Sequence, residues 1–108
     1  MRILVVEDNL MLALDLKDQL ERAGYEVLGP ADTFKDAVEL ARRCRPELAL
    51  VNIDLSNGDS GIDVAKTLRD DLDCPSLFVS GSWSEARQAK DIALGFIAKP
   101  YNHDLGNL

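Results

Sequence analysis

Near its N-terminus the chain reads Ile3-Leu4-Val5-Val6-Glu7-Asp8-Asn9. A run of four apolar residues is too short for a helix and is typical of a parallel strand that is covered on both faces. The strand ends where Glu7 and Asp8 begin, and Asn9 is a residue type that commonly caps the first turn of a helix. This stretch therefore predicts a buried strand, an acidic turn and a helix, in that order.

The same order of elements repeats along the rest of the chain. Apolar runs predict four further strands, at residues 25–29, 48–51, 77–79 and 95–98. Apolar residues at helical spacing predict helices between the strands, one of them beginning at Asp32 or Thr33 and one over residues 84–93. The tail from residue 102 has room for only about two turns of a last helix, which would be short or truncated. This alternation predicts an α/β fold with a doubly wound, five-stranded parallel sheet in one domain, residues 1–108.

Length and charge narrow the class of protein. With 108 residues, 46% of them apolar and 29% charged, the chain has the composition of one globular domain. Its 19 acidic and 12 basic residues give a formal net charge of −7, which argues against direct partnership with nucleic acid or with an anionic membrane. Cys44 and Cys74 lack metal-ligand spacing and are expected to be buried thiols in a reducing compartment. No apolar stretch is long enough to span a bilayer, so we expect a cytoplasmic protein.

Polar side chains follow four of the predicted strands. They are Glu7 and Asp8 after the first, Asn52 and Asp54 after the third, Ser80 after the fourth and Lys99 after the fifth. The carboxyl ends of parallel strands meet at one edge of the sheet, so these side chains are expected to converge there. Crowded carboxylates attract a divalent cation, and Mg²⁺ prefers such oxygens together with phosphoryl oxygens. The pattern therefore indicates a site for Mg²⁺ and a phosphoryl group.

At this point the chain resembles the receiver domain of bacterial two-component response regulators, the CheY-like family. The resemblance covers essentially the whole chain and rests on five segments, residues 3–9, 46–55, 58–61, 75–81 and 95–101. It implies the flavodoxin-like strand order 2-1-3-4-5. It also implies a regulatory module of phosphorelay signalling, not an enzyme, whose partners are a histidine kinase or phosphotransferase, an output domain, or both. A homodimer is compatible with the resemblance, although a short tail would leave one face of the domain incomplete.

The resemblance also implies a role for each polar residue at the strand ends. Glu7 and Asp8 match the acidic pair that holds Mg²⁺, to which Asp54 would add its backbone carbonyl and Asn52 its side chain. Three further positions match the residues that bind the phosphoryl group and switch on activation, namely Ser80, Phe96 and Lys99.

One position departs from the family pattern. The family has an aspartate phosphoacceptor at the end of the third strand, and the spacing from Pro46 and to Gly61 places Asn52, not Asp54, at this position. A carboxamide is neutral and cannot form a stable acyl phosphate, so phosphorylation is expected to be blocked and Mg²⁺ binding weakened. Either this is a receiver that signals without aspartyl phosphorylation, or the aspartate was replaced to prevent it.

An enzymatic alternative uses the same stretch of sequence. Residues 52–56 follow an apolar strand and echo the motif of haloacid dehalogenase-type phosphatases, which would make the chain a small Mg²⁺-dependent phosphatase. That motif begins with an aspartate nucleophile, which is again Asn52 here. Such enzymes also carry a capping domain, for which 108 residues leave no room.

Overall fold

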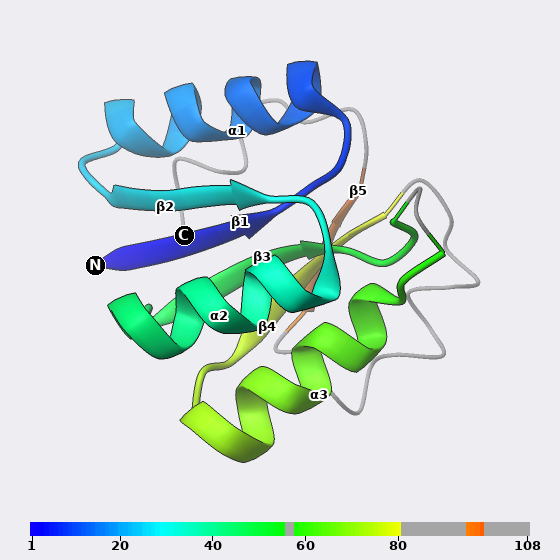
Figure 1. Cartoon of the computed structure of the whole chain (residues 1–108). Helices are drawn as coiled ribbons and strands as arrows, with labels where there is room; N and C mark the ends of the chain where they lie inside the picture. The colour runs from blue at the N-terminus through cyan, green and yellow to red at the C-terminus, as the bar shows by residue number, and fades with distance from the viewer. Residues whose placement is uncertain (56–57, 81–94, 99–108) are drawn as a thin grey trace.

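A computed structural model of the chain describes residues 1–55, 58–80 and 95–98, with the backbone alone for Ser80 and residues 95–98. The elements in chain order are β1 (Arg2–Val6), α1 (Leu10–Arg22), β2 (Glu26–Ala31), α2 (Phe34–Cys44), β3 (Leu48–Asn52), α3 (Gly61–Leu72), β4 (Ser76–Ser80) and β5 (Gly95–Ala98) (Figure 1). The strands form a parallel sheet in the order β2-β1-β3-β4-β5. The predicted α/β fold and strand order are therefore confirmed. The helix expected over residues 84–93 and the expected short last helix lie outside the described residues.

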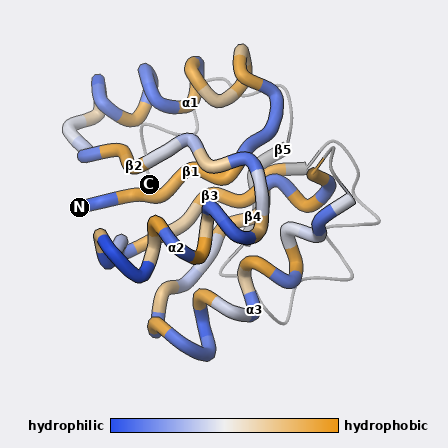
Figure 2. The backbone as a smooth tube through the Cα atoms, viewed as in Figure 1, coloured by the Kyte–Doolittle hydropathy of each residue, from blue (hydrophilic) through white to orange (hydrophobic). Residues whose placement is uncertain are grey.

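The helices cover both faces of the sheet, with α1 on one face and α2 and α3 on the other (Figure 1). Alternation along β1 explains this arrangement, because successive side chains of a strand point to opposite faces. Ile3 and Val5 pack in the core cluster that includes residues of α1, whereas Leu4 and Val6 pack with residues of α2 and α3. Figure 2 shows the resulting distribution, with apolar strands at the centre of the molecule.

Side chains of the expected types begin the described helices. The Asn9 side chain accepts a hydrogen bond from the Leu12 N–H at 3.2 Å, as the sequence predicts. Of the two candidates for the second helix, Thr33 is the N-cap and accepts from the Asp36 N–H at 3.1 Å. These bonds satisfy N–H groups that a first helical turn cannot pair internally.

One predicted strand has different limits in the structure. The sequence predicts residues 25–29, but β2 runs to Ala31, whose carbonyl accepts from the Glu7 N–H at 2.9 Å. Gly29 and Pro30 look like the end of a strand in sequence. At the edge of a sheet they are accommodated instead as an irregularity, where the register with β1 shifts between Leu4 and Val6.

The strand register decides which residues meet at the carboxyl edge of the sheet. Val6 of β1 pairs with Val51 of β3, so Glu7 and Asn52 come level on neighbouring strands. Asn52 pairs in turn with Val79 of β4, which places the backbone of Ser80 one residue further along. Within the described residues, no helix combines the length and the apolar character needed to cross a membrane.

Candidate functional site

Asn52 is the last residue of the central strand β3, and its carboxamide lies among the acidic residues that follow β1. Asn52 Nδ2 donates to Glu7 Oε2 at 2.9 Å and to Asp8 Oδ1 at 3.0 Å. It also donates to the backbone carbonyl oxygen of Asp54 at 2.7 Å. The four candidate residues Glu7, Asp8, Asn52 and Asp54 therefore lie together, as the rule for carboxyl ends of parallel strands predicts.

The surroundings determine which way the Asn52 amide points. The NH₂ group has two hydrogens to donate, and here three oxygens accept from it, so at least one hydrogen is shared. The reversed amide would place its own oxygen against two carboxylates and a carbonyl, none of which can donate a hydrogen. Only the orientation with the NH₂ group toward the acids is therefore compatible with this site.

Burial makes these hydrogen bonds important for Glu7. Only 3% of Glu7 and 8% of Asn52 are exposed to solvent. A carboxylate removed from water needs hydrogen-bond donors or a counter-charge. Glu7 Oε2 receives donors from Asn52 and from the Asn9 N–H at 3.3 Å, so the N-cap of α1 and the end of β3 both orient the same oxygen.

Asp54 takes part through its backbone, while its side chain is exposed. The chain turns back on itself after this residue, because Asp54 forms an antiparallel bridge with Ser60 and the Gly61 N–H donates to the Ile53 carbonyl at 2.7 Å. The turn holds the Asp54 carbonyl against the Asn52 amide. The structure thus turns the Asp54 carbonyl toward Asn52, and the role of this carbonyl as a ligand of Mg²⁺ stays a prediction.

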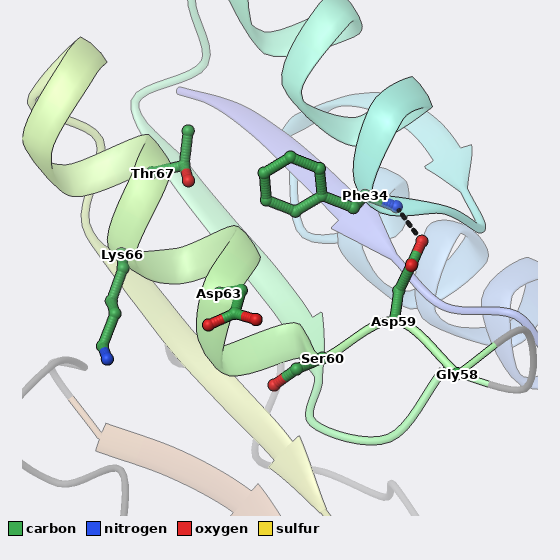
Figure 3. Close-up of a pocket in the computed structure, with 7 residues that line it drawn as sticks. All are labelled: Phe34, Gly58, Asp59, Ser60, Asp63, Lys66 and Thr67. Carbon is green, nitrogen blue, oxygen red and sulfur yellow. Dashed lines mark hydrogen bonds between the residues drawn. The ribbon is translucent and has the colours of Figure 1, made fainter.

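Gly61 and Asp59 support the site but were not predicted as site residues. A Cβ at Gly61 would overlap the Asn52 carbonyl oxygen and would lie 2.7 Å from its carbon, so only glycine lets α3 begin this close to β3. Asp59 Oδ2 accepts from the Phe34 N–H at 2.8 Å and ties the loop between β3 and α3 to the start of α2 (Figure 3). Because these partners are 25 residues apart, no local pattern could have identified the contact.

Of the other three candidates, the structure describes the backbone of Ser80 and Phe96. Ser80 ends β4 and its backbone pairs with Ala98 of β5, at the same edge of the sheet as Asn52. The backbone of Phe96 pairs with that of Phe78, one strand further from the acids. Lys99 lies outside the described residues.

A hollow among the described residues lies elsewhere. It has a volume of about 510 Å³ and opens between the starts of α2 and α3 (Figure 3). It is lined by Phe34, Gly58, Asp59, Ser60, Asp63, Lys66 and Thr67. The acids after β1 and Asn52 are not among these residues, so the hollow is separate from the candidate site.

The arrangement around Asn52 does not fit a Mg²⁺ ion. Mg²⁺ binds oxygen lone pairs at 2.0–2.1 Å in octahedral geometry. Glu7, Asp8 and the Asp54 carbonyl offer such oxygens, but all three face the Asn52 NH₂ group, which repels a cation. No group of three or more His, Cys, Asp or Glu side chains that could hold a metal occurs in the described part of the chain.

Comparison with known proteins agrees with the fold. The family model described as "Response regulator receiver domain" matches residues 3–106. The chain is 37% identical over 79 residues to the phyllosphere-induced regulator PhyR of Methylorubrum extorquens, which covers 72% of this chain and 30% of PhyR. The matches give no support to the phosphatase alternative.

Two solved structures are similar over nearly the whole chain. The signal receiver domain of a modulated diguanylate cyclase from Desulfovibrio desulfuricans superposes with a TM-score of 0.86 and 36% identity, covering 96% of this chain and 85% of that one. A response regulator from Burkholderia pseudomallei, solved with a phosphorylated aspartic acid, a calcium ion and citrate, superposes with a TM-score of 0.81 and 37% identity. The match covers 94% of this chain and 61% of that protein.

Proposed function

The chain belongs to the response regulator receiver family, and from this premise we propose that residues 1–108 form one receiver domain of two-component signalling in which Asn52 occupies the phosphoacceptor position. The observation that carries the proposal is the contact of the Asn52 side chain with both acids that follow β1. This domain acts as a regulatory switch and not as a turnover enzyme.

Placement along the chain supports Asn52 over Asp54 as the acceptor position. Asn52 is the last residue of β3, is buried, and turns its side chain toward Glu7 and Asp8. The Asp54 side chain is exposed and offers the site only a carbonyl. A phosphoryl group at position 52 would be level with the end of β4, where Ser80 is proposed to bind it, together with Lys99. Phe96 is proposed as the aromatic residue that moves when Ser80 does.

The proposed chemistry differs from that of a phosphorylated receiver. The Asn52 nitrogen lone pair is delocalised into the carbonyl, so the amide is not an anionic nucleophile toward phosphorus. Switching in this chain then depends on a partner that binds one of two conformations more tightly. The acidic pair by itself would attract Mg²⁺, but the Asn52 NH₂ group faces the same oxygens, so Mg²⁺ would bind only weakly and only after this amide turns away.

The partners proposed are a histidine kinase or phosphotransferase, an output domain, or both, in the cytoplasm. An apolar surface on the first turns of α1 supports a protein partner at this edge of the domain. Leu10, Met11 and Leu14 are 65%, 82% and 50% exposed, and the first of them follows the acidic pair by two residues. A partner that approaches Asn52 would cover these side chains. We propose no direct binding to nucleic acid or to a membrane. A second copy of the chain is a further proposed partner, in a homodimer.

Intact mass after incubation with acetyl phosphate and Mg²⁺ tests the proposed function. We expect the Asn52→Asp variant to gain one phosphoryl group and the unchanged chain to gain none. Gln19→Glu is the matched control, since it makes the same amide-to-acid change on the surface of α1, beside Asp15. Phosphorylation of the unchanged chain would show that a residue other than Asn52 is the phosphoacceptor. If the Asn52→Asp variant also fails to react, the chain shares the fold of receiver domains but not their phosphorylation chemistry.

A further inference from the structure

The three oxygens that surround Asn52 Nδ2 come from two turns at the carboxyl edge of the sheet, which we call the acidic rim. Glu7 Oε2 and Asp8 Oδ1 belong to the turn after β1, and the Asp54 carbonyl belongs to the turn after β3. Two carboxylates and a carbonyl that point at one place are hard-oxygen ligands of the kind that divalent cations bind. In this chain the place is taken by a hydrogen-bond donor of the chain itself.

We propose that the Asn52 amide replaces the divalent cation of this site, so that the acidic rim of this chain is complete without metal. The inference rests on the proposed function, in which Asn52 occupies the phosphoacceptor position. It adds that the Asn52 amide holds the acidic side chains in place. The rim then keeps one arrangement whether or not Mg²⁺ is available.

Electrostatics support this replacement. Glu7 is buried and is next in sequence to a second acid, so the pair needs positive potential nearby. The two N–H dipoles of the amide provide it at distances of 2.9 and 3.0 Å, within the ordinary range of N–H···O hydrogen bonds. An aspartate at position 52 would bring a third carboxylate to the same place and would remove all three of these hydrogen bonds.

Geometry excludes simultaneous binding of the amide and the cation. An ion at its usual distance of about 2.1 Å from these oxygens would lie against the amide hydrogens. Mg²⁺ can enter only if the amide turns away, which forfeits the bond of 2.7 Å to the Asp54 carbonyl along with the two bonds to the acids. The unchanged chain should therefore bind Mg²⁺ more weakly than its Asn52→Asp variant, in which a carboxylate oxygen replaces the NH₂ group.

Thermal unfolding in EDTA and in millimolar Mg²⁺ tests the inference on three proteins: the unchanged chain, Asn52→Asp and Gln19→Glu. We expect Mg²⁺ to leave the Tm of the unchanged chain and of Gln19→Glu in place, and to raise the Tm of Asn52→Asp from a lower value in EDTA. A Mg²⁺-dependent rise for the unchanged chain would overturn the inference. A Tm of Asn52→Asp that does not change with Mg²⁺ would overturn the inference as well. The oxygens of Glu7, Asp8 and Asp54 would then form no cation site for the amide to replace.

A second measurement does not depend on the variant folding. In the unchanged chain, ¹⁵N NMR should show the Asn52 side-chain NH₂ protected from hydrogen exchange and unmoved by Mg²⁺. Rapid exchange, or a shift on adding Mg²⁺, would contradict the inference. The phosphorylation assay on Asn52→Asp separates these failures from failure of the proposed function, because it can succeed even if the unchanged chain binds Mg²⁺.

Discussion

Asp59 Oδ2 accepts a hydrogen bond of 2.8 Å from the backbone N–H of Phe34, the first residue of α2. The helix N-terminus carries unpaired N–H groups and a partial positive charge, both of which favour a carboxylate. Thr33 caps the Asp36 N–H of the same turn, so the two side chains satisfy different donors. The loop that carries the Asp54 carbonyl is thereby held to α2, the helix that packs beside α3 on the same face of the sheet (Figure 1).

Replacing Asp59 by alanine should remove this contact. We expect Asp59→Ala to lower the free energy of unfolding by about 1–2 kcal/mol, the usual effect of losing a cap, and Asp59→Asn to retain most of it. Urea unfolding followed by circular dichroism measures the difference. Glu39→Ala, on the exposed side of α2, is the control and should change stability by less than about 0.5 kcal/mol. Equal losses for Asp59→Ala and Asp59→Asn would contradict the capping role.

Two glycines of the loop between β3 and α3 should tolerate alanine differently. At Gly61 a Cβ would lie 2.7 Å from the Asn52 carbonyl carbon and 2.8 Å from Ile53 Cα, so Gly61→Ala must displace the end of β3. We expect a loss of about 3 kcal/mol or more. Gly58 has φ +90° and open space around it, so Gly58→Ala should cost only backbone strain, about 1–2 kcal/mol. Parallel urea titrations compare the two, and equal losses would show that the close contact at Gly61 is unimportant.

Cys74 should make stability depend on pH in the alkaline range. The residue is 2% exposed, and burial raises the pKa of its thiol from 9.0 to about 11. Below pH 9 the thiol is neutral in the folded and the unfolded chain. Above it the unfolded chain ionises first, so stability should fall between pH 9 and 11, by at most about 3 kcal/mol.

The Cys74→Ala variant isolates this effect from other groups that titrate at high pH. Its stability should fall less steeply than that of the unchanged chain between pH 9 and 11, whereas Cys44→Ala, at a half-buried position, should keep the full slope. Urea midpoints at several pH values provide the comparison. Parallel curves for all three proteins would be evidence against the raised pKa of Cys74.

Ser76 is expected to be replaceable with a gain in stability. Its side chain is 1% exposed, and its Oγ has no hydrogen-bond partner among the described residues. A buried hydroxyl without a partner costs free energy that alanine does not. We expect Ser76→Ala to raise the free energy of unfolding by about 1 kcal/mol, measured by the urea midpoint. A loss of similar size would mean that the hydroxyl has a partner after all.

Much of this architecture could be predicted because its signals are local. The apolar runs of β1, β3, β4 and β5 predict strands, and the carboxyl-end rule brings Glu7 level with Asn52. The end of β2 was misjudged because Gly29-Pro30 reads as a turn, whereas pairing with β1 extends the strand past it. The direction of the Asn52 amide could not be predicted, since it depends on how the chain after Asp54 folds back over the strand.

The irregular end of β2 affects how the protein behaves in concentrated solution. In the part of the chain that the structure describes, β2 pairs only with β1 and so forms one border of the sheet. A regular border strand offers a row of backbone groups to which another chain can add a strand, which is a common route to aggregation. Here Pro30 has no N–H to offer, and Gly29, with φ +95°, breaks the regular extended path. This border is therefore a poor template for fibril growth, and copies of the chain that meet at it should separate again.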